Sequence, residues 1–309
     1  MSRCVVSVCI VTFNQAGFIG QCLRSILDQR VDAEVEVLLG DDASTDSTVG
    51  VVSDLMASYP GRINYFRRSS NIGAFDNMCD LLNRARGDFV ARVDGDDYWF
   101  PGKLQKQLDY LWARPDCPAV YTNASVVDVG GRIVGCFSDY DRTSVNLGQL
   151  MTNGNFLNNS SVLFRAGLVQ GWVEPRQQID YQVHLWMACR GCLGYIPDRL
   201  TAYRVGSAGS MLNDMNVLVR ELYWSALLSV PKEYVSGVDW NRAVSDFMRR
   251  VFFRSLRTGD WKTFWVWRER VLLDSSAGWA GLFAAIARIG FKSLRGRLLP
   301  RNRRILYPY

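Results

Sequence analysis

Apolar runs of strand length alternate with helix-like segments along the first 115 residues of the chain. Residues 5–13 form a run continuous enough for a buried strand, and similar runs cover 35–39, 63–67 and 89–93. Between the runs, apolar residues recur at the spacing of one helix face, as in the series Phe18, Cys22, Leu23, Ile26 and Leu27. Repeated strand–helix units of this length predict a doubly wound, mostly parallel α/β sheet with ligands at the carboxyl ends of its strands.

The pattern changes after the helix expected at 103–113. Strand-like runs dominate the next hundred residues, which indicates a smaller mixed β region. A helical stretch opens at Asp180 and is followed by two strands expected at 193–196 and 201–205, on either side of Pro197. From about Asn213 onward the pattern is helical. The boundaries that we expect are 1–115 and 116–212 for the two halves of a sheet domain, 1–212 for that domain, and 213–309 for a helical C-terminal region.

Three carboxylates follow the fourth apolar run within four positions. Asp94, Asp96 and Asp97 stand where that strand ends, ahead of an aromatic pair and Pro-Gly. Acidic groups this close repel one another unless a cation lies among them, and a hard divalent ion keeps its remaining positions for water and phosphate oxygens. A solvated acidic loop is the alternative. An EF-hand calcium loop is excluded, because its twelfth position would be Gln105 rather than a bidentate acid.

Composition indicates a folded globular protein, since 48% of the 309 residues are hydrophobic and 21% are charged. The first apolar run is interrupted by Ser7 and Thr12 and is expected to be a strand rather than a signal peptide. The eight cysteines are scattered through apolar surroundings, which favours free thiols in a reducing cytoplasm. Cys189 and Cys192 form one close pair, but His184 is the only histidine, so packing is favoured over zinc binding.

The basic character of the chain lies in its tail. The net charge is +6, and all thirty acids lie at or before Asp274, whereas seven cations follow it. Within 277–299 an apolar helical stripe faces away from most of the cations, which is typical of a helix at a membrane interface. The stripe consists of Trp279, Leu282, Phe283, Ile286 and Ile289.

The uninterrupted apolar part of this tail is about fifteen residues long, whereas a bilayer needs about twenty. We therefore expect a basic amphipathic helix that lies on a membrane surface. A terminal helix packed on the body of the protein is the alternative. Nucleic acid is disfavoured as a partner, because no nucleic-acid-binding motif accompanies the cations.

Six sequence blocks resemble, in order, the inverting glycosyltransferases of family 2, which have the A-type glycosyltransferase fold. The blocks are VSVCIVTFNQ, LLGDDASTDST, NIGAFDN, VDGDDYWFPGKLQKQ, NNSSVLFR and DYQVHLWMACRGCLGYIPDRLTAYRV. Each block alone is a weak signal, but the six in order cover residues 5–211. The resemblance implies that 1–212 is a catalytic domain, with a nucleotide-binding half at 1–115 and an acceptor-binding half at 116–212.

The resemblance also implies roles for individual residues. Phe13 would lie against the nucleotide base, Asp42 would accept a hydrogen bond from that base, and Asp41 would support the turn. Asp94 and Asp96 would form the metal-binding Asp-x-Asp motif, with Asp96 the direct ligand of Mn²⁺ or Mg²⁺ and Asp94 facing the ribose or the metal's waters. The other residues expected in the nucleotide-sugar site are Thr12, Asn14, Asn71, Gly73 and Arg204.

Asp180 matches the catalytic base of the family, and the chemistry accounts for such a residue. Sugar transfer from a nucleoside diphosphate needs charge stabilisation on the leaving oxygens, which a carboxylate-held divalent ion supplies. It also needs a base on the opposite face that takes the proton of the attacking hydroxyl. Apolar neighbours such as Ile179 and Tyr181 would raise the pKa of this carboxylate by desolvation. A plain helix cap is the structural alternative for Asp180.

Two positions depart from the family pattern. Members often have Glu-Asp where this chain has Ile179 before Asp180, and a histidine soon after the Tyr-Arg pair, where this chain has none. The metal would then take an extra water, or the enzyme would depend in part on Arg204 as a cation. Ser207 and Ser210 are candidate neighbours of the metal.

These features predict an inverting glycosyltransferase that uses a nucleotide-sugar donor, in our interpretation a UDP-sugar, and a saccharide or lipid-linked saccharide acceptor in cell-surface polysaccharide biosynthesis. We expect a cytoplasmic protein, bound peripherally at the inner face of the cell membrane. The alternatives are a metal-dependent nucleotidyltransferase or phosphotransferase and a non-catalytic sugar-nucleotide-binding membrane scaffold. Dinucleotide oxidoreduction is disfavoured, because no G-x-G-x-x-G follows the first strand.

Overall fold

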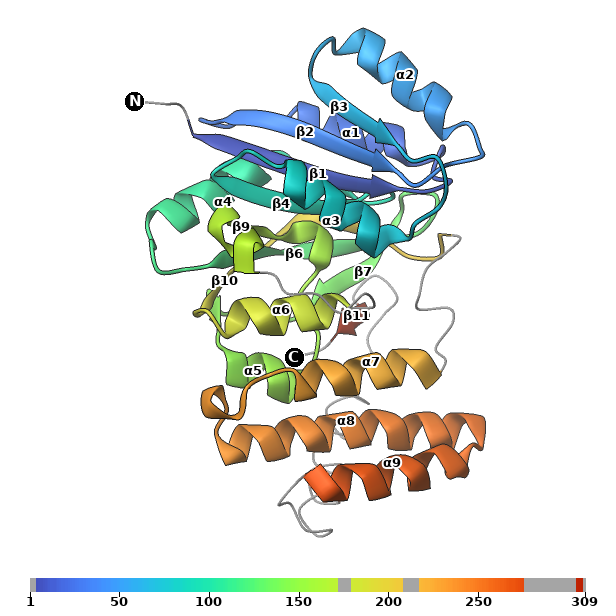
Figure 1. Ribbon diagram of the computed structural model, residues 1–309, viewed down its shortest axis with the longest axis vertical. Helices are drawn as coiled ribbons and strands as arrows, with labels where there is room; N and C mark the ends of the chain where they lie inside the picture. The colour runs from blue at the N-terminus through green and yellow to red at the C-terminus, as the bar shows by residue number, and fades with distance from the viewer. Residues whose placement is uncertain (1–3, 172–178, 208–216, 275–303, 308–309) are drawn as a thin grey trace.

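The computed structural model describes residues 4–171, 179–207, 217–274 and 304–307. Four parallel strands form the N-terminal half of its sheet, in the order β3-β2-β1-β4 (Figure 1). These strands are β1 (Val5–Thr12), β2 (Glu34–Asp41), β3 (Ile63–Arg67) and β4 (Phe89–Asp94). Their connecting helices are α1 (Ile19–Leu27), α2 (Thr48–Ser58) and α3 (Ala74–Arg84). The predicted run of strand–helix units is therefore confirmed.

The register of these strands brings their carboxyl ends to one level. Thr12 at the end of β1 pairs with Asp41 at the end of β2, and Val11 pairs with Asp94 at the end of β4. The turns that follow the three strands consequently start along one edge of the sheet. Parallel pairing thus places the two acidic segments of the sequence side by side.

The remaining strands make the sheet mixed. β9 runs antiparallel between β4 and β6, and β10 lies parallel to β6 while it also pairs with the short strands β5 and β8. These strands are β5 (Tyr98–Trp99), β6 (Ala119–Val127), β7 (Ile133–Ser138), β8 (Ser144–Val145), β9 (Leu163–Arg165) and β10 (Leu193–Arg204). The predicted mixed β region after the helix α4 (Lys103–Trp112) is confirmed.

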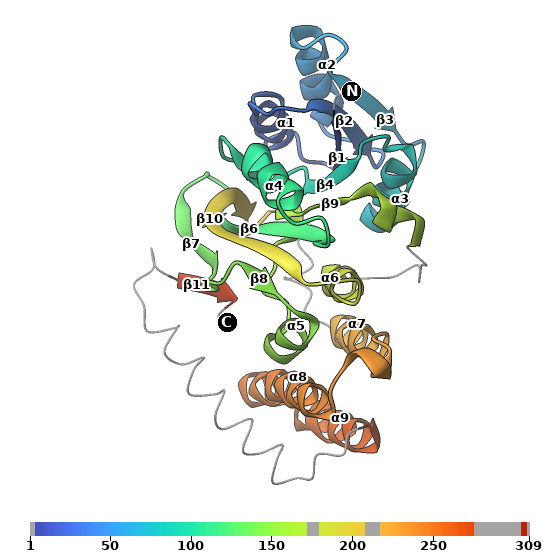
Figure 2. The same ribbon diagram turned by 90° about the vertical axis from the view of Figure 1, so that its left-hand side faces the viewer.

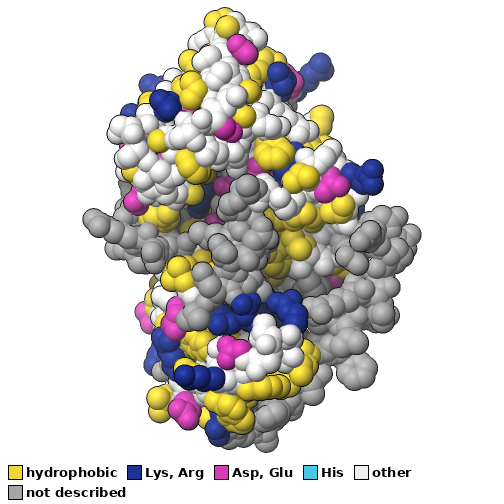
Figure 3. All heavy atoms as spheres, turned by 90° about the vertical axis from the view of Figure 1, so that its right-hand side faces the viewer, with side chains coloured by type: hydrophobic (Ala, Val, Ile, Leu, Met, Phe, Trp, Pro, Cys, Tyr) yellow, Lys and Arg dark blue, Asp and Glu magenta, His cyan; other side chains and the backbone are white. Residues whose placement is uncertain are grey.

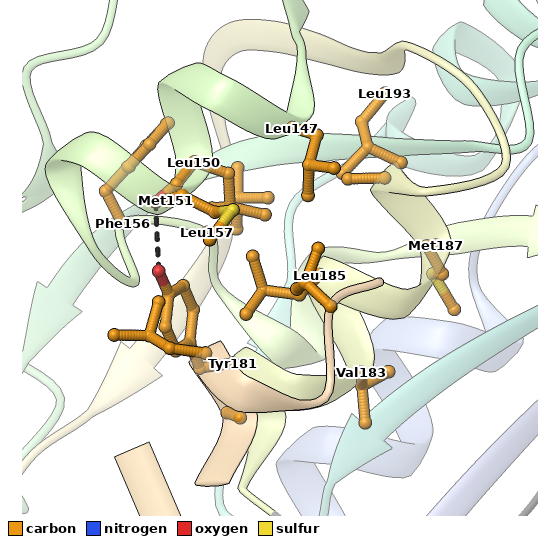
Figure 4. Packing of buried hydrophobic residues seen from close by; sticks show 14 of the residues in the cluster. Leu147, Leu150, Met151, Phe156, Leu157, Tyr181, Val183, Leu185, Met187 and Leu193 are labelled. Atoms are coloured by element: carbon orange, nitrogen blue, oxygen red, sulfur yellow. Dashed lines mark hydrogen bonds between the residues drawn. The ribbon is translucent and has the colours of Figure 1, made fainter. Parts of the chain in front are cut away.

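Helices cover both faces of the sheet and define two cores. One face packs on α1, α2 and α4 and is built from apolar residues such as Ile10, Leu23 and Leu108. The other face packs on α3, α5 (Leu147–Asn153) and α6 (Asp180–Ala188). Figure 4 shows part of this second core, where the Tyr181 hydroxyl donates to the backbone carbonyl of Leu150 at 3.2 Å. The second core carries the helix that begins at Asp180.

A stack of three helices continues from the second core. They are α7 (Val217–Leu228), α8 (Gly237–Thr258) and α9 (Trp261–Asp274). Elsewhere in the described chain, short 3₁₀ turns occur at Asn159–Ser161 and Ala166–Gly171, and another at Lys232–Tyr234 connects α7 to α8. α7 packs on α6, and α8 packs on α5 and α9, so the stack extends away from the sheet (Figure 2). The helical region expected after residue 213 is present. Among the described helices none combines the length and apolar character that crossing a membrane requires.

Two features of the C-terminal part differ from the sequence-based expectation. The segments expected as two strands around Pro197 form the single strand β10, whose pairing with β6 shifts register near Arg199. A further strand, β11 (Arg304–Tyr307), pairs in parallel with β7 at the sheet edge. The amphipathic helix expected within 277–299 lies outside the described residues.

Candidate active site

The turns after β1 and β2 are joined through Asn14. Its Oδ1 accepts hydrogen bonds from the backbone N–H groups of Thr45 at 2.7 Å and Asp46 at 3.3 Å, and its own N–H donates to the Ser44 hydroxyl at 3.0 Å. Asn14 has a φ of 51°, in the left-handed region that asparagine adopts more readily than most residues. The neighbouring Phe13 is 44% exposed, so its ring is available to a ligand at this edge. Its place against a nucleotide base stays a prediction.

The acidic pair that ends β2 orients neighbouring segments. Asp42 accepts from the N–H groups of Ile72 at 2.7 Å and Gly73 at 2.8 Å, and it thereby fixes the loop that contains Asn71. Asp41 is fully buried and accepts hydrogen bonds from its own turn and from β3. Each oxygen of Asp42 retains a second lone pair, so the expected contact with a base remains a prediction that this geometry permits.

Gly95, between the two expected metal ligands, lies where only a glycine fits. A Cβ at this position would lie 2.5 Å from Gln15 Oε1 and 2.9 Å from Thr12 Oγ1. The Thr12 hydroxyl donates to Gln15 Oε1 at 2.9 Å, which fixes the opposing wall. The loop after β4 therefore rests directly on the loop after β1, with Asp94 and Asp96 on either side of the contact.

Residues from the end of β10 hold the acidic loop. The Ser207 hydroxyl donates to Asp96 Oδ2 at 2.6 Å, and the backbone N–H of Arg204 donates to Asp97 Oδ1 at 2.8 Å. Ser207 is thus the neighbour of Asp96 in the position where the family often supplies a histidine. Ser210, the other candidate, lies outside the described residues.

The guanidinium of Arg204 is occupied by protein groups. Its Nε donates to the Asp96 carbonyl at 2.9 Å, Nη1 donates to the Asp128 carbonyl at 2.9 Å, and Nη2 donates to Gln21 Oε1 at 3.0 Å. The Phe18 ring lies 4.5 Å from the guanidinium carbon. These contacts make Arg204 a positioning residue for the acidic loop, and its expected contact with the donor stays a prediction.

Asp180 is the first residue of α6 and does not cap it. The N-cap residue is Ile179, and no side chain accepts a capping hydrogen bond there. The Asp180 side chain is exposed to solvent, and no hydrogen bond joins its carboxylate to another described residue. The carboxylate is therefore free to accept a proton from a ligand, whereas the helix-cap alternative has no support in the structure.

The charges of Asp96 and Asp180 both act on the carboxylate of Asp94. Burial raises the pKa of Asp94 to about 7, and the negative charges of Asp180 and Asp96 contribute to the rise. Burial also raises the pKa of Asp180, while the positive charge of Arg92 opposes that rise. The Asp180 side chain nevertheless keeps contact with solvent. Figure 3 faces the strand carboxyl ends and shows several acidic side chains on the upper part of that face.

The acidic loop fits a divalent cation for which the protein supplies only part of the coordination shell. Neighbouring carboxylates repel one another and are stabilised by a positive ion among them. No three acidic, histidine or cysteine side chains in the described ranges are grouped closely enough to coordinate an ion by themselves. Mn²⁺ or Mg²⁺ would therefore take one or two oxygens from Asp94 and Asp96 and complete its shell with water and phosphate oxygens.

Cavity size alone does not identify this site. Two pockets of about 580 Å³ lie elsewhere, one beside the start of β2 and the other beside β7, and the three carboxylates line neither of them. Sequence reasoning also missed two groups near Asp180, namely Arg92 and His184. The available signals were a cation inside the otherwise apolar strand β4 and a histidine one helical turn after Asp180.

The fold and the carboxylates at its strand edge define an A-type glycosyltransferase architecture. Residues 7–135 match the family model described as glycosyl transferase family 2, and this match places that region of the chain in the family. The family prediction made from the six sequence blocks is therefore confirmed.

All eight cysteines are free thiols in the structure, as the sequence predicted.

Curated relatives share parts of the chain. Rv1520 of Mycobacterium tuberculosis is 31% identical over 202 residues, which cover 64% of this chain and 58% of that protein. The glycosyltransferase alr2836 of Nostoc sp. is 24% identical over 261 residues, covering 80% of this chain and 76% of that protein. Chondroitin synthase of Escherichia coli is 28% identical over 131 residues, covering 42% and 18%. The chain thus spans somewhat more than half the length of the first of these relatives.

Solved structures share the fold. S. aureus TarS 1–349 in complex with UDP-GlcNAc superposes with a TM-score of 0.60 at 17% identity, over 87% of this chain and 92% of that one. The mannosyltransferase PcManGT from Pyrobaculum calidifontis, in complex with GDP-Man and Mn²⁺, gives a TM-score of 0.56 at 16% identity over 95% and 88%. These likenesses confirm the predicted fold class.

Proposed function

We propose that the protein is an inverting glycosyltransferase that moves a sugar from a nucleotide-sugar donor to a hydroxyl group of a saccharide or lipid-linked saccharide. The observation that carries the proposal is that Asp94 and Asp96 lie where β4 ends, level with the carboxyl ends of β1 and β2, and that the charge of Asp180 acts on Asp94. The solved structures of similar fold support the donor class, since one holds UDP-GlcNAc and another holds GDP-Man with Mn²⁺. Chondroitin synthase among the relatives supports a polysaccharide product.

The acidic loop would bind the diphosphate end of the donor. Asp94 and Asp96 would hold Mn²⁺ or Mg²⁺, which supplies positive charge to the leaving phosphate oxygens when it is bound. Ser207 and Arg204 keep the loop in place, because one donates to Asp96 and the other bridges the loop to Asp128 and Gln21. This preorganised arrangement would stabilise negative charge without moving during the reaction.

Asp180 would remove the proton from the acceptor hydroxyl. Its carboxylate has no hydrogen-bond partner among the described residues, and burial raises its pKa, which increases its basicity. An ionised Asp180 opposite the leaving diphosphate would direct the acceptor oxygen to the far face of the sugar, so the anomeric configuration would invert. The incoming hydroxyl loses its proton to Asp180, and the bond to the diphosphate breaks as the new glycosidic bond forms.

A place at the membrane surface is a further part of the proposal. Its support is compositional, because the seven cations after Asp274 occur without any acid, which favours attraction to anionic lipid. The acceptor would then be a lipid-linked saccharide at the inner face of the cell membrane. Sedimentation of the full chain with vesicles of anionic and of neutral lipid measures this association directly.

A thermal-shift panel tests the function. We expect UDP or a UDP-sugar with Mn²⁺ to raise the melting temperature, because a ligand that binds only the native state stabilises it. Asp96→Ala should abolish the manganese-dependent part of the shift. Asp180→Asn should keep the shift and lower turnover by about a hundredfold or more, since a general base contributes about 10²–10⁴-fold.

The products separate this function from its competitors. A glycosyltransferase releases a nucleoside diphosphate and forms a glycoside, whereas a nucleotidyltransferase or phosphotransferase releases pyrophosphate or transfers phosphate. A scaffold would bind the nucleotide and form no product with any acceptor. Absence of a shift with every nucleotide, or an unchanged manganese-dependent shift in Asp96→Ala, would contradict the proposal.

A further inference from the structure

Arg92 is a buried cation that has no partner among the described residues. It projects from β4 and is 8% exposed, and no hydrogen-bond acceptor or carboxylate in the described ranges pairs with its guanidinium. Its Nε is completely buried. A charge removed from water without a partner is strongly unfavourable, so such a group indicates a missing ligand or water. Because side chains alternate along a strand, Arg92 shares its face of β4 with Asp94.

His184 is a second buried group with an unused atom. It lies on α6 one turn after Asp180 and therefore on the same side of the helix. Its Nδ1 is 3.0 Å from Asn155 Oδ1, and since an amide oxygen only accepts, Nδ1 carries the hydrogen and Nε2 is left as an acceptor. Nε2 is buried and has no partner. Burial and the charge of Arg92 lower the pKa of His184 to about 3, so the ring is neutral near pH 7.

The two groups lie near each other, beneath the catalytic edge. The charge of Arg92 acts on His184, on Asp94 and on Asp180, so its guanidinium lies within electrostatic range of each of them. The His184 ring packs edge-on against Tyr121, with 5.0 Å between centroids, and this contact fixes its orientation toward the sheet. This side of the site therefore offers the Arg92 guanidinium, which only donates hydrogen bonds, near His184 Nε2, which only accepts them.

A hydroxyl group both donates and accepts, so adjacent hydroxyl groups complement this pair of atoms. We propose that Arg92 and His184 form a subsite that binds hydroxyl groups of the sugar that is transferred. The inference rests on the proposed function, because it takes the donor to be a nucleotide-sugar. The subsite lies toward α6 from the acidic loop, on the side where Asp180 would receive the acceptor hydroxyl.

The test compares a nucleotide-sugar with its own nucleoside diphosphate. The probes are UDP-glucose, UDP-galactose, UDP-GlcNAc and GDP-mannose, each titrated with Mn²⁺ into the full chain by calorimetry beside UDP or GDP. His184→Phe keeps an aromatic ring on Tyr121 and changes no charge, because the histidine is neutral. We expect the variant to weaken the best-bound sugar nucleotide about tenfold. The affinity for the matching diphosphate should change less than about twofold.

Arg92→Lys gives an independent arm. It keeps the positive charge that acts on Asp94 and Asp180 but loses the planar fork of donors. We expect the same selective loss, by about tenfold or more, in binding of the sugar nucleotide. Leu185→Met, a buried change on the same helix, is the packing control and should leave both affinities unchanged.

The outcomes separate the subsite from a structural water that merely bridges Arg92 and His184. A lower melting temperature with equal effects on sugar nucleotide and diphosphate, or with no effect on either, would overturn the inference while the proposed function stands. If His184→Phe fails to fold, Arg92→Lys decides in the same way. Failure of every nucleotide to bind the unmodified chain would overturn the proposed function and the subsite with it.

Discussion

Asp180 carries a carboxylate whose protonation would set the acid limit of activity. Burial raises its pKa above the ordinary aspartate value of about 4, and only the ionised form accepts a proton. We therefore expect turnover to fall as the pH is lowered through this raised pKa, and to reach a plateau above it. Initial rates at saturating donor and Mn²⁺, measured from pH 4.5 to 8, give the pH at which turnover falls on the acid side of the profile.

Two controls make this pH profile specific. Donor affinity measured at each pH shows whether the loss comes from protonation of Asp94, whose pKa is about 7, instead of from the base. Asp180→Asn should leave a low rate without the same acid limb, because the amide does not titrate in this range. Constant turnover down to pH 4.5 would contradict a base with a raised pKa at this position.

At the scale of single residues, the sequence predicted the acidic residues of the candidate site better than the contacts that hold those residues in place. Asp94 and Asp96 could be proposed because strand ends in parallel sheets converge, whereas Asp180 was proposed from the family resemblance. The contact from Ser207 to Asp96 could not be derived, since it depends on how β10 returns to β4 across more than a hundred residues. The free guanidinium of Arg92 likewise appears only once its neighbours are placed.

The turns after β1 and β2 act as one element, because Asn14 joins them. Asn14→Ala should lower the free energy of unfolding by about 1–3 kcal/mol, since it removes two accepted hydrogen bonds and forces alanine to a φ of 51°. Asn14→Gly removes the same bonds without the backbone strain and should cost less. Urea denaturation measures both, and titration with UDP and Mn²⁺ measures the effect on the site.

The comparison of the two variants separates strain from bonding. A cost for alanine that glycine does not share reports the left-handed backbone, whereas an equal cost reports the lost hydrogen bonds. Both variants should also weaken nucleotide affinity, because the hydrogen bonds of Asn14 hold Phe13 and the Asp41–Asp42 turn in place. If both variants keep the stability and the nucleotide affinity of the unmodified protein, the hydrogen bonds of Asn14 have no role in the site.

Among the elements, the buried strands were the most predictable and the edges the least. Continuous apolar runs gave β1 to β4, because such strands are covered on both faces. The strand β10 was expected as two pieces, because Pro197 and the exposed residues beside it resemble a turn, whereas the chain crosses this point with a register shift. The strand β11 was missed, because four residues at the end of a basic tail carry little periodic signal.

The molecule as a whole is organised around a core that crosses the boundary expected near residue 213. Cys9 on β1, Tyr181 on α6, Trp224 on α7 and Val271 on α9 belong to one contiguous apolar cluster. Trp224 is fully buried, with Phe247 at 5.1 Å and Trp267 at 6.1 Å between ring centroids. The division into domains stays a prediction, and the shared core indicates how it is best tested.

Trp224→Ala should destabilise the whole described molecule by about 3–5 kcal/mol, as truncation of a buried tryptophan does. Because the cluster extends from α9 to β1, we expect a single unfolding transition that moves to lower temperature in the variant. Scanning calorimetry measures this, and Trp265→Ala, at a 51% exposed position, is the matched control with a change below about 1 kcal/mol. Two separate transitions would contradict the shared core and support independent domains.

The pairing of β11 with β7 has a consequence for how copies of this protein behave together. An uncovered border strand presents a row of unsatisfied amide and carbonyl groups to which another polypeptide can add. Tyr307 reinforces the cover, with its ring centroid 4.7 Å from that of Phe137. Residues 304–307 thus replace the six-residue edge of β7 with a border strand of only four residues. Because short edge strands offer few groups for pairing, we expect deletion of these residues to favour association between copies of the protein.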